Sequence, residues 1–277
     1  MHMDERQAFV SAAEGNAPSD VTIVLQLGYR GTKFSGYAEQ EGQRTVAGEL
    51  RRALETYLGR PCELTCAGRT DAGVHALAQY VSLSSTEDEL EIRGPRLWRA
   101  LTALTPDDIS IRGVYTASSD FSARFDAVAR SYRYRISCGN ARPIRGWEYS
   151  WWLRGERWLD VDAMDEAARH LVGEHDFESF CKVSSAKLIH DDGRSTCRNV
   201  REIHVGHLAE AGEECVAIDV TGNAFLHNMV RIITGTLVEV GRGHRSAEWV
   251  GEALAAKDRS AAGPTAPPQG LTLERVD

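Results

Sequence analysis

Apolar residues recur along this chain with two different spacings, and the spacing changes from one segment to the next. An apolar residue at every second position is typical of a half-buried strand, and a spacing of three to four is typical of an amphipathic helix. The first pattern predicts strands over residues 21–27, 76–83, 109–115, 129–137, 200–205, 216–220 and 271–276. The second predicts helices over 46–58, 95–104 and 162–172, a long helix after Asn223, and another from Ser246 to about Lys257.

The predicted helices begin and end at residues that favour helix termini. Thr45 can cap the first helix with its hydroxyl group, and Gly59 can end it, with Pro61 just beyond. Asn223 and Ser246 can cap the two C-terminal helices in the same way. These boundaries support the helical interpretation of the spacing.

Strands and helices alternate in two similar halves of the chain, without a detectable sequence repeat. This order predicts an α+β fold of two similar domains, each an antiparallel or mixed sheet with helices on one face. Residues 21–120 are predicted to form the N-terminal domain and residues 121–277 the C-terminal domain. Residues 1–20 are polar and small, and they are predicted to be a disordered tail.

Composition places the chain among ordinary globular proteins. Its 277 residues, 42% of them hydrophobic and 26% charged, suffice for two domains. The six cysteines include no C-x-x-C pair, and no apolar signal segment opens the chain, which is typical of a cytoplasmic protein with reduced thiols. Cys62 and Cys66 lack a second ligand pair with metal-site spacing, so no metal is expected. No apolar run approaches the roughly 20 residues that cross a bilayer, so no membrane contact is expected.

The distribution of charge bears on the partner. The net charge of −8 argues against nucleic acid, because phosphate contacts need positive charge. Residues 124–157, however, hold eight arginines and three acids, a balance of +5 that leaves −13 for the rest of the chain. Guanidinium groups suit phosphates and base stacking, so this segment supports a nucleic acid as a partner.

The residues with the clearest chemical potential lie in the segment Cys66–Ala76, where Gly68 and Gly73 bracket Arg69 and Asp71. On an extended backbone, residues two apart point to the same side, so both charged side chains can act on one object. The two glycines permit tight turns or close approach by a ligand. From these residues alone, a solvated surface ion pair is the commoner outcome.

The unbroken run Gly-Arg-Thr-Asp-Ala-Gly-Val-His at 68–75 resembles the active-site segment of the TruA family of tRNA pseudouridine synthases. Further segments resemble that family in the same order, namely Gly31-x-x-Phe34-x-Gly36-Tyr37-x-x-Gln40 and the stretches 129–134, 225–235 and 265–271. The resemblance covers about Val21 to Val276. The chain departs from it at Arg30, where the family usually has aspartate, at Ala47, where glutamine is common, and over the longer polar insertion 184–196.

The resemblance implies an isomerase that converts uridine to pseudouridine at positions 38, 39 and 40 of the tRNA anticodon stem-loop. It also implies an active-site cleft between the two domains, and a homodimer whose basic cleft holds the tRNA, with contacts from both subunits and without a cofactor. Carried over residue by residue, it makes Asp71 the nucleophile and Tyr132 a substrate-binding residue of the base pocket. It makes Arg231 the partner of Asp71, and Arg69 an aid to flipping the uridine.

The chemistry explains why these residue types are suitable. The reaction breaks the N-glycosidic bond, turns the uracil and joins its C5 to C1′, without water. A carboxylate can add to C1′ or to C6, or stabilise positive charge on the sugar, and the sequence leaves all three open. A guanidinium beside the carboxylate keeps it ionised. A tyrosine can stack on the base and act as an acid or base, and an arginine can replace a flipped uridine in the stack.

Each of these residues also has a structural alternative. Asp71 could form a turn or a surface ion pair, and Tyr132 could be core, since Tyr134 and Ile136 share its strand face. Arg231 lies within an apolar helix stripe, so it is expected to be partly buried and to need an acid. Asp71 is the candidate for that acid.

Two other functions are compatible with the same scaffold or chemistry. One is a catalytically inactive RNA-binding protein, against which the intact set of Asp71, Tyr132 and Arg231 argues. The other is a glycosidase with a carboxylate nucleophile, against which the lack of a convincing second catalytic acid argues. His75 and His227 are expected to be structural hydrogen-bonding residues.

Overall fold

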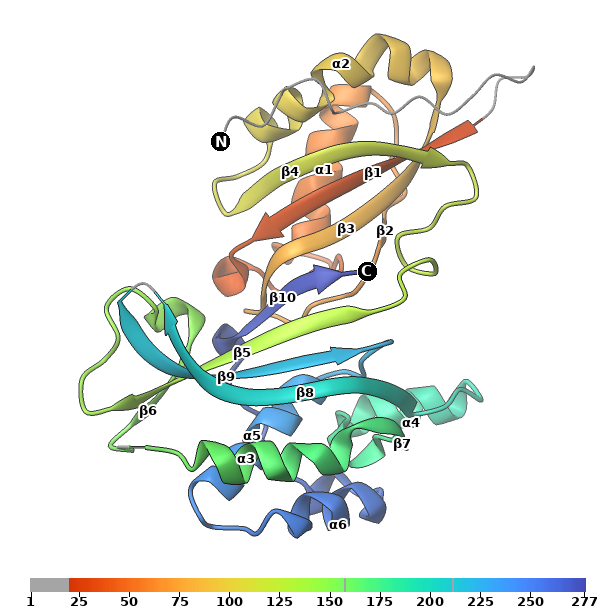
Figure 1. The fold of residues 1–277 in the computed structure, drawn as a ribbon. Coiled ribbons are helices and arrows are strands. Elements are labelled where there is room, and N and C mark those ends of the chain that lie inside the picture. Colours follow the sequence, from red (N-terminus) through yellow and green to blue (C-terminus); the bar gives the residue numbers. More distant parts are fainter. Residues whose placement is uncertain (1–19, 157, 211) are drawn as a thin grey trace. The chain divides into compact units, whose positions relative to one another are not determined.

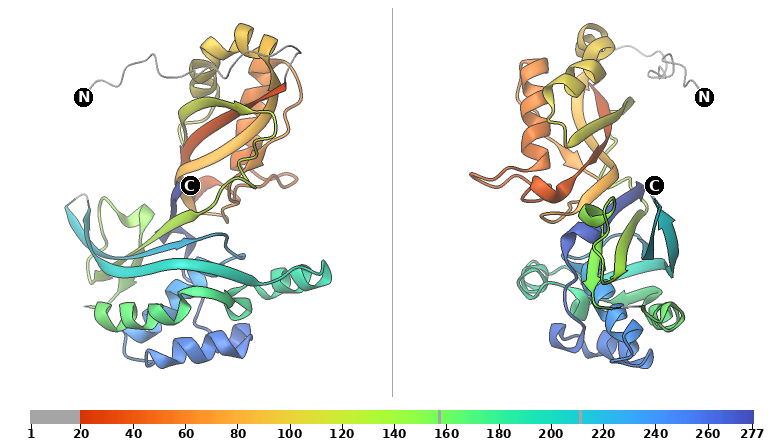
Figure 2. Two further views of the ribbon diagram at one scale, coloured as in Figure 1. Left: turned by 45° about the vertical axis from the view of Figure 1, so that its right-hand side comes forward. Right: turned by 90° about the vertical axis from the view of Figure 1, so that its left-hand side faces the viewer.

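The computed structural model describes residues 20–156, 158–210 and 212–277. These residues form two compact units, the first made of the described residues up to Val128 together with Arg275–Asp277, and the second of Ala129–Glu274. Figure 1 labels the elements of both units, and Figure 2 gives two further views. The predicted N-terminal tail lies outside the described residues, apart from Asp20, which begins the first strand.

The first unit contains a small antiparallel sheet. Its central strand β1 (Asp20–Tyr29) lies between β3 (His75–Thr86) and β4 (Ile109–Ser118) and runs antiparallel to both. The two-residue strand β2 (Thr65–Cys66) pairs with β3. The chain between β2 and β3 is therefore a short loop that leaves and re-enters the sheet at one place.

Two helices, α1 (Val46–Leu58) and α2 (Glu87–Leu104), pack against each other on one side of these strands (Figure 2). Each helix presents an apolar face to the core of the unit, where the following side chains are at most 1% exposed: Leu50, Leu54, Leu97 and Leu101. Burial of a leucine side chain contributes about 2 kcal/mol, so these two faces hold the helices in place.

The ends of α1 lie where the sequence predicts them, whereas α2 begins earlier. The Thr45 hydroxyl accepts the Gly48 amide at 3.2 Å, and Gly59 ends α1 with φ +77°. The predicted start of α2 near Pro95 is wrong, because the Thr86 hydroxyl caps the helix by accepting the Glu89 amide at 3.2 Å. The first two turns of α2 are mostly polar, and their apolar residues Leu90 and Ile92 are only two apart, so the apolar spacing gave no sign of a helix there.

The second unit contains a larger sheet built around β5 (Arg130–Gly139). The antiparallel order continues through β9 (Glu213–Gly222), β8 (Cys197–Glu210) and β7 (Gly173–Asp176). β10 (Leu271–Val276) is also hydrogen-bonded to β5. Most of the sheet is thus a meander of neighbouring antiparallel strands.

A short strand and four helices complete the second unit. β6 (Trp151–Arg154) pairs in parallel with the last residues of β5. Helices α3 (Val161–Ala168), α5 (Met229–Gly241) and α6 (Glu248–Ala256) lie on one side of the strands, whereas α4 (Val183–Asp191) lies beside the start of β8 (Figures 1 and 2). The short 3₁₀ helices of the two units are Gly31–Lys33, Trp147–Tyr149, Arg169–Leu171, Glu178–Phe180, Arg259–Ala261 and Pro268–Gly270.

Helix α5 is the central helix of the second unit. Its side chains Ile232, Ile233 and Leu237 are fully buried. A Cβ atom at Gly235 would lie 1.8 Å from the Pro264 carbonyl oxygen, so the loop before β10 lies directly on the helix. The predicted α+β class is confirmed by this combination of sheets and one-sided helices.

Two helices of the second unit begin later than predicted, and a third helix was not predicted. The helix expected after Asn223 begins only at Met229, because the Asn223 side chain accepts the amides of Asn199 and Ala224 and so holds a turn. The helix expected from Ser246 begins at Glu248. The polar insertion, for which no element was predicted, contributes most of α4, whose buried residue is Ala186.

Candidate active site

Arg69 and Asp71 lie in the loop between β2 and β3. The Ala67 amide donates to the Tyr80 carbonyl at 2.9 Å, and this bond continues the pairing of the two strands into the loop. At the far end, the Val74 amide donates to the Asp71 carbonyl at 3.1 Å across a turn. The Arg69 side chain is exposed and that of Asp71 is half-buried, as a side chain that meets a substrate requires.

A second loop, which follows β1, is bonded to the backbone of this one. The Tyr37 amide donates to the Thr70 carbonyl at 3.0 Å, and the Gly73 amide donates to the Phe34 carbonyl at 3.3 Å. A Cβ atom at Gly31 would lie 1.9 Å from the backbone of Val74, so only glycine allows this approach. The loop after β1 and the loop that carries Asp71, which both resemble the family, are therefore joined by their backbones into one structure.

His75 adds a side-chain bond to this frame. Its Nδ1 atom accepts the Gly31 amide at 3.1 Å, and the ring is only 2% exposed. The expectation that His75 is a structural hydrogen-bonding residue is confirmed. Because Nδ1 accepts, this nitrogen is without a proton in this arrangement.

A buried polar network lies under the loop. Gln79 donates from Nε2 to the Gly68 carbonyl, and its Oε1 atom accepts the Gly68 amide at 3.3 Å. The hydroxyl groups of Tyr29 and Thr70 share a hydrogen bond at 2.7 Å, and Gln79 donates to Tyr29 at 3.4 Å. Burial raises the pKa of Tyr29 far above its ordinary value, so the hydroxyl keeps its proton. The residues on each side of Arg69, Gly68 and Thr70, are thus held by hydrogen bonds to the buried side chains of Gln79 and Tyr29.

Sequence reasoning missed Tyr29 and Gln79. One signal was available: Gln79 occupies an inward position of β3, in the same alternation as the buried residues Val81 and Leu83. A polar amide in such a place must have buried partners. The identity of those partners depends on the loop conformation, which the spacing of residues does not specify.

Tyr132 and Tyr134 lie on β5 in the second unit. The Tyr132 side chain is 8% exposed, and its ring meets that of Phe225 edge to face, with centroids 5.2 Å apart. Tyr134 is fully buried and donates to the Pro267 carbonyl at 2.6 Å. Both tyrosines are therefore buried, as the structural alternative for Tyr132 expects, and Tyr132 retains only a little exposed surface near the start of the strand.

Arg231 lies in the first turn of α5 and is half-buried, as its place in the apolar stripe predicts. Its Nε atom donates to the Ala266 carbonyl at 2.8 Å, and its Nη1 atom donates to Asn228 Oδ1 at 2.7 Å. Asn228 directly precedes the helix with φ +65°. Asp71 belongs to the first unit and Arg231 to the second, and each unit is described by itself, so their pairing stays a prediction.

The arginine-rich segment 124–157 is less positive than its own charge count indicates. Arg133 forms a two-pronged ion pair with Asp219 of β9, with bonds of 2.7 and 2.9 Å. Arg135 pairs with Glu210 at 2.6 Å and with Glu274 at 3.1 Å. These acids belong to other strands, so a count of charged residues within 124–157 does not include them. Another member, Arg157, lies outside the described residues.

Arg142 differs from these paired arginines. It is exposed, and its guanidinium lies over the rings of Trp147 and Trp152 at 5.6 and 5.3 Å. In the part of the chain that the structure describes, it forms no ion pair with an acid. Of the segment's described arginines, it is thus a good candidate for contact with phosphate or a base.

Among the described residues, no three His, Cys, Asp or Glu side chains come close enough together to hold a metal ion. Burial raises the pKa of the Cys66 thiol, which lies directly before the loop. The helices of the described ranges include none that is long and apolar enough to span a bilayer.

The chain is similar to known proteins over nearly its whole length. A sequence profile described as tRNA pseudouridine synthase matches residues 167–277. The chain is 42% identical over 255 residues to tRNA pseudouridine synthase A of Shewanella woodyi, with 92% of each protein covered. It is 44% identical over 256 residues to the protein of that name from a Geobacillus species, with 92% of this chain and 97% of the relative covered. The Streptomyces avermitilis protein of that name is 40% identical over 266 residues, with 94% and 88% covered.

Proposed function

The chain belongs to the family of tRNA pseudouridine synthases, and we propose that it isomerises uridine to pseudouridine in tRNA with Asp71 as its nucleophile. In this reaction the bond between C1′ and N1 breaks and a bond between C1′ and C5 forms. The proton of C5 is lost and N1 gains one, so the atoms balance without water or a cofactor. The protein must therefore hold one uridine still while its base turns.

The observation that supports Asp71 best is the way its loop is held. Bonds from Tyr37, Gly73 and Gln79 fix the loop backbone from two sides, while the carboxylate itself is half-exposed. A nucleophile must approach its target in one geometry, and such fixing removes the entropy of the search. Attack at C1′, attack at C6 and stabilisation of charge on the sugar all use this same placement.

The other roles follow from the character of each side chain. Arg69 is exposed and two residues from Asp71, which suits a group that takes the place of the flipped uridine. Tyr132 presents an aromatic surface next to Phe225, which suits the base pocket. Arg231 is anchored by Asn228 and Ala266, and we propose that it also pairs with Asp71 and keeps the carboxylate ionised.

The proposal extends to the target and the assembly. We propose that the modified uridines are those at positions 38, 39 and 40 of the anticodon stem-loop. We also propose that the enzyme is a cytoplasmic homodimer in which both subunits contact the tRNA. The resemblance of the motif segments to the TruA family supports these points.

The test is to incubate the purified protein with an unmodified tRNA transcript and map pseudouridine at single-nucleotide resolution. We expect pseudouridine within positions 38–40 and no release of free uracil. Release of uracil would instead identify a glycosidase, and tRNA binding without any pseudouridine would identify an inactive RNA-binding protein. The oligomeric state follows from the mass of the protein in solution.

A further inference from the structure

The insertion that forms α4 is attached to the turn that holds Arg231. The Lys182 amide, just before α4, donates to the His227 carbonyl at 3.1 Å. The hydroxyl of Ser185 in the first turn of α4 shares a hydrogen bond of 2.9 Å with His227 Nδ1. His227 directly precedes Asn228, whose side chain accepts a hydrogen bond from Arg231. The insertion therefore lies next to one half of the candidate active site.

This part of the chain is basic although the protein as a whole is acidic. Residues 182–198 contain four lysines and arginines against two aspartates, in a chain of net charge −8. Two of the four lysines of the chain are among them. The insertion together with its flanking residues Lys182 and Arg198 is thus a local positive segment outside the region 124–157.

Most of this positive charge has no acidic partner. Arg194 pairs with Asp192 at 2.5 Å. Within the described ranges, Lys182, Lys187 and Arg198 form no ion pair with an acid.

Two of the acids near α4 have partners of their own, whereas Asp191 of α4 forms no ion pair within the described residues. Asp176 pairs with Lys257 at 3.0 Å, and Glu178 lies 3.6 Å from His190. The three unpaired basic groups therefore contrast with Arg133 and Arg135, whose charges are offset.

Arg198 is the most constrained of the three. It is half-buried at the start of β8, and its Nη1 atom donates to the carbonyls of Ser195 and Cys197 at 2.9 and 2.6 Å. Its Nε atom is buried and finds no hydrogen-bond partner among the residues that the structure describes. Burial also lowers the pKa of Arg198, so the charged form lacks stabilisation that an anion would supply. A phosphate group fits a guanidinium with free donors.

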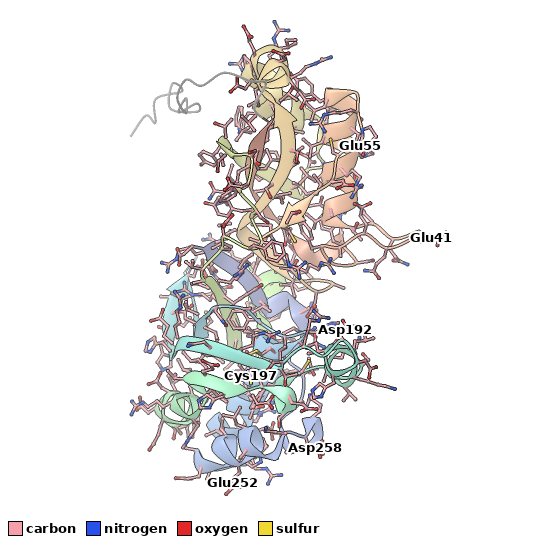
Figure 3. All side chains as sticks on the ribbon, turned by 90° about the vertical axis from the view of Figure 1, so that its right-hand side faces the viewer. Glu41, Glu55, Asp192, Cys197, Glu252 and Asp258 are labelled. Carbon is pink, nitrogen blue, oxygen red and sulfur yellow. The ribbon has the colours of Figure 1, made fainter. Side chains whose placement is uncertain are left out.

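We propose that Lys182, Lys187 and Arg198 form a phosphate-binding surface for the tRNA backbone beside the target uridine. This inference rests on the proposed function, because tRNA is the polyanion concerned. The acidic net charge repels RNA at long range, so binding depends on local positive surfaces. Figure 3 labels Asp192 at the end of α4 and Cys197 at the start of β8, between which the insertion returns to the sheet.

The test compares two variants with a matched control. Lys182→Gln with Lys187→Gln removes two exposed charges, and Arg198→Gln removes the half-buried one. Arg245→Gln is the control, because it removes an exposed charge of the same unit that lies over Trp249 at the start of α6. The measurements are the affinity for unmodified tRNA as a function of salt, turnover at saturating tRNA, and the thermal unfolding midpoint.

We expect the double variant to bind tRNA about 10-fold more weakly at low salt. The salt slope, which is the slope of the logarithm of the binding constant against the logarithm of the salt concentration, should be smaller in magnitude by about one to two. Turnover at saturating tRNA should stay within about two-fold of the parent, since these residues position the backbone and not the reacting atoms. Arg198→Gln should lower the slope by about one, Arg198→Lys should restore part of the loss, and the control should match the parent.

The inference would be overturned if both variants bound tRNA with the same affinity and the same salt slope as the parent protein. A loss of turnover at saturation with unchanged affinity would also overturn it, and would mean that α4 acts by placing Arg231. Competition for the surface by polyglutamate but not by an RNA oligonucleotide would point to a protein partner instead. A parent protein that binds tRNA but forms no pseudouridine would overturn the proposed function alone, and the binding comparison would still decide this inference.

Discussion

Gln79 binds the backbone of Gly68 with both ends of its side-chain amide, donating to the carbonyl and accepting the amide. Gln79 is fully buried on β3, and Gly68 directly precedes Arg69. A residue of the sheet therefore determines the conformation of the loop that presents Asp71. The same amide also reaches Tyr29, which holds Thr70 on the other side of Arg69.

The variant Gln79→Leu should slow turnover at saturating tRNA by about 10- to 100-fold, because a small displacement of a reacting group has effects of this size. It should also destabilise the protein by about 1–3 kcal/mol, since the Gly68 amide and carbonyl lose their buried partner. The affinity for tRNA should change little. Single-turnover kinetics and urea unfolding measure these effects.

The matched control is Ser82→Ala, on the same strand. Its buried hydroxyl accepts the Ala123 amide at 3.0 Å, so the control loses a buried hydrogen bond that does not hold the Asp71 loop. It should lose a similar amount of stability and keep its turnover. Equal losses of turnover in the two variants would show that Gln79 acts only through general stability.

Local patterns predicted most of the elements, and one of their failures arose from a partner that is distant in sequence. The Thr45 hydroxyl finds its partner three residues away, so the start of α1 is readable from sequence. Asn223 also looks like a helix cap, but its side chain accepts the amide of Asn199, a residue of β8. The turn that results delays α5 until Met229.

The charge near the candidate site also depends on partners that are distant in sequence. A count along the chain includes Arg133 and Arg135 but leaves out Asp219 and Glu210, which become neighbours only when β5, β9 and β8 pair. The run around Asp71, in contrast, resembles the family so closely that the sequence alone predicted it as the active-site segment. The Gln79 network beneath it depends on the loop conformation and was not evident.

A second prediction concerns Arg44 and Asp108, which tie the loop after β1 to the start of β4. The guanidinium donates to both carboxylate oxygens at 2.9 Å. This hydrogen bonding holds the pKa of Asp108 below its ordinary value of 3.8. The stabilisation is therefore complete above that ordinary value and is lost as the pH falls through the lowered pKa.

The variant Asp108→Asn should lower the free energy of unfolding by about 1 kcal/mol at pH 7. The difference from the parent should shrink as the pH falls below about 4, because the parent then also loses its carboxylate. Urea unfolding at several pH values measures it, with the exposed neighbour Asp107→Asn as control. A difference that stays constant down to about pH 2 would contradict the assignment.

A third prediction concerns Arg231. The variant Arg231→Ala should abolish turnover and destabilise the protein by about 1–3 kcal/mol, because the Ala266 carbonyl loses its donor. Arg231→Lys should keep the charge but lose the second bond to Asn228, and so keep only a small part of the turnover. The control Thr236→Val removes a hydroxyl of the same helix that accepts the Gly263 amide. It should lose stability but not turnover, and substantial turnover by a folded Arg231→Ala protein would exclude the proposed pairing with Asp71.

The last prediction concerns Asp71 itself. Asparagine is nearly the same size and still accepts hydrogen bonds, so Asp71→Asn should leave the fold and the loop frame intact. It removes the negative charge and the nucleophilic oxygen, without which the isomerisation cannot proceed. Pseudouridine formation should therefore be lost, with tRNA affinity within a few-fold of the parent, because phosphate contacts dominate binding. Tritium release from C5-labelled uridine in tRNA measures turnover directly, and the exposed acid Asp107→Asn serves again as control. If Asp71 were only a turn residue or a surface ion-pair member, its asparagine variant would keep most of its activity, as the control should.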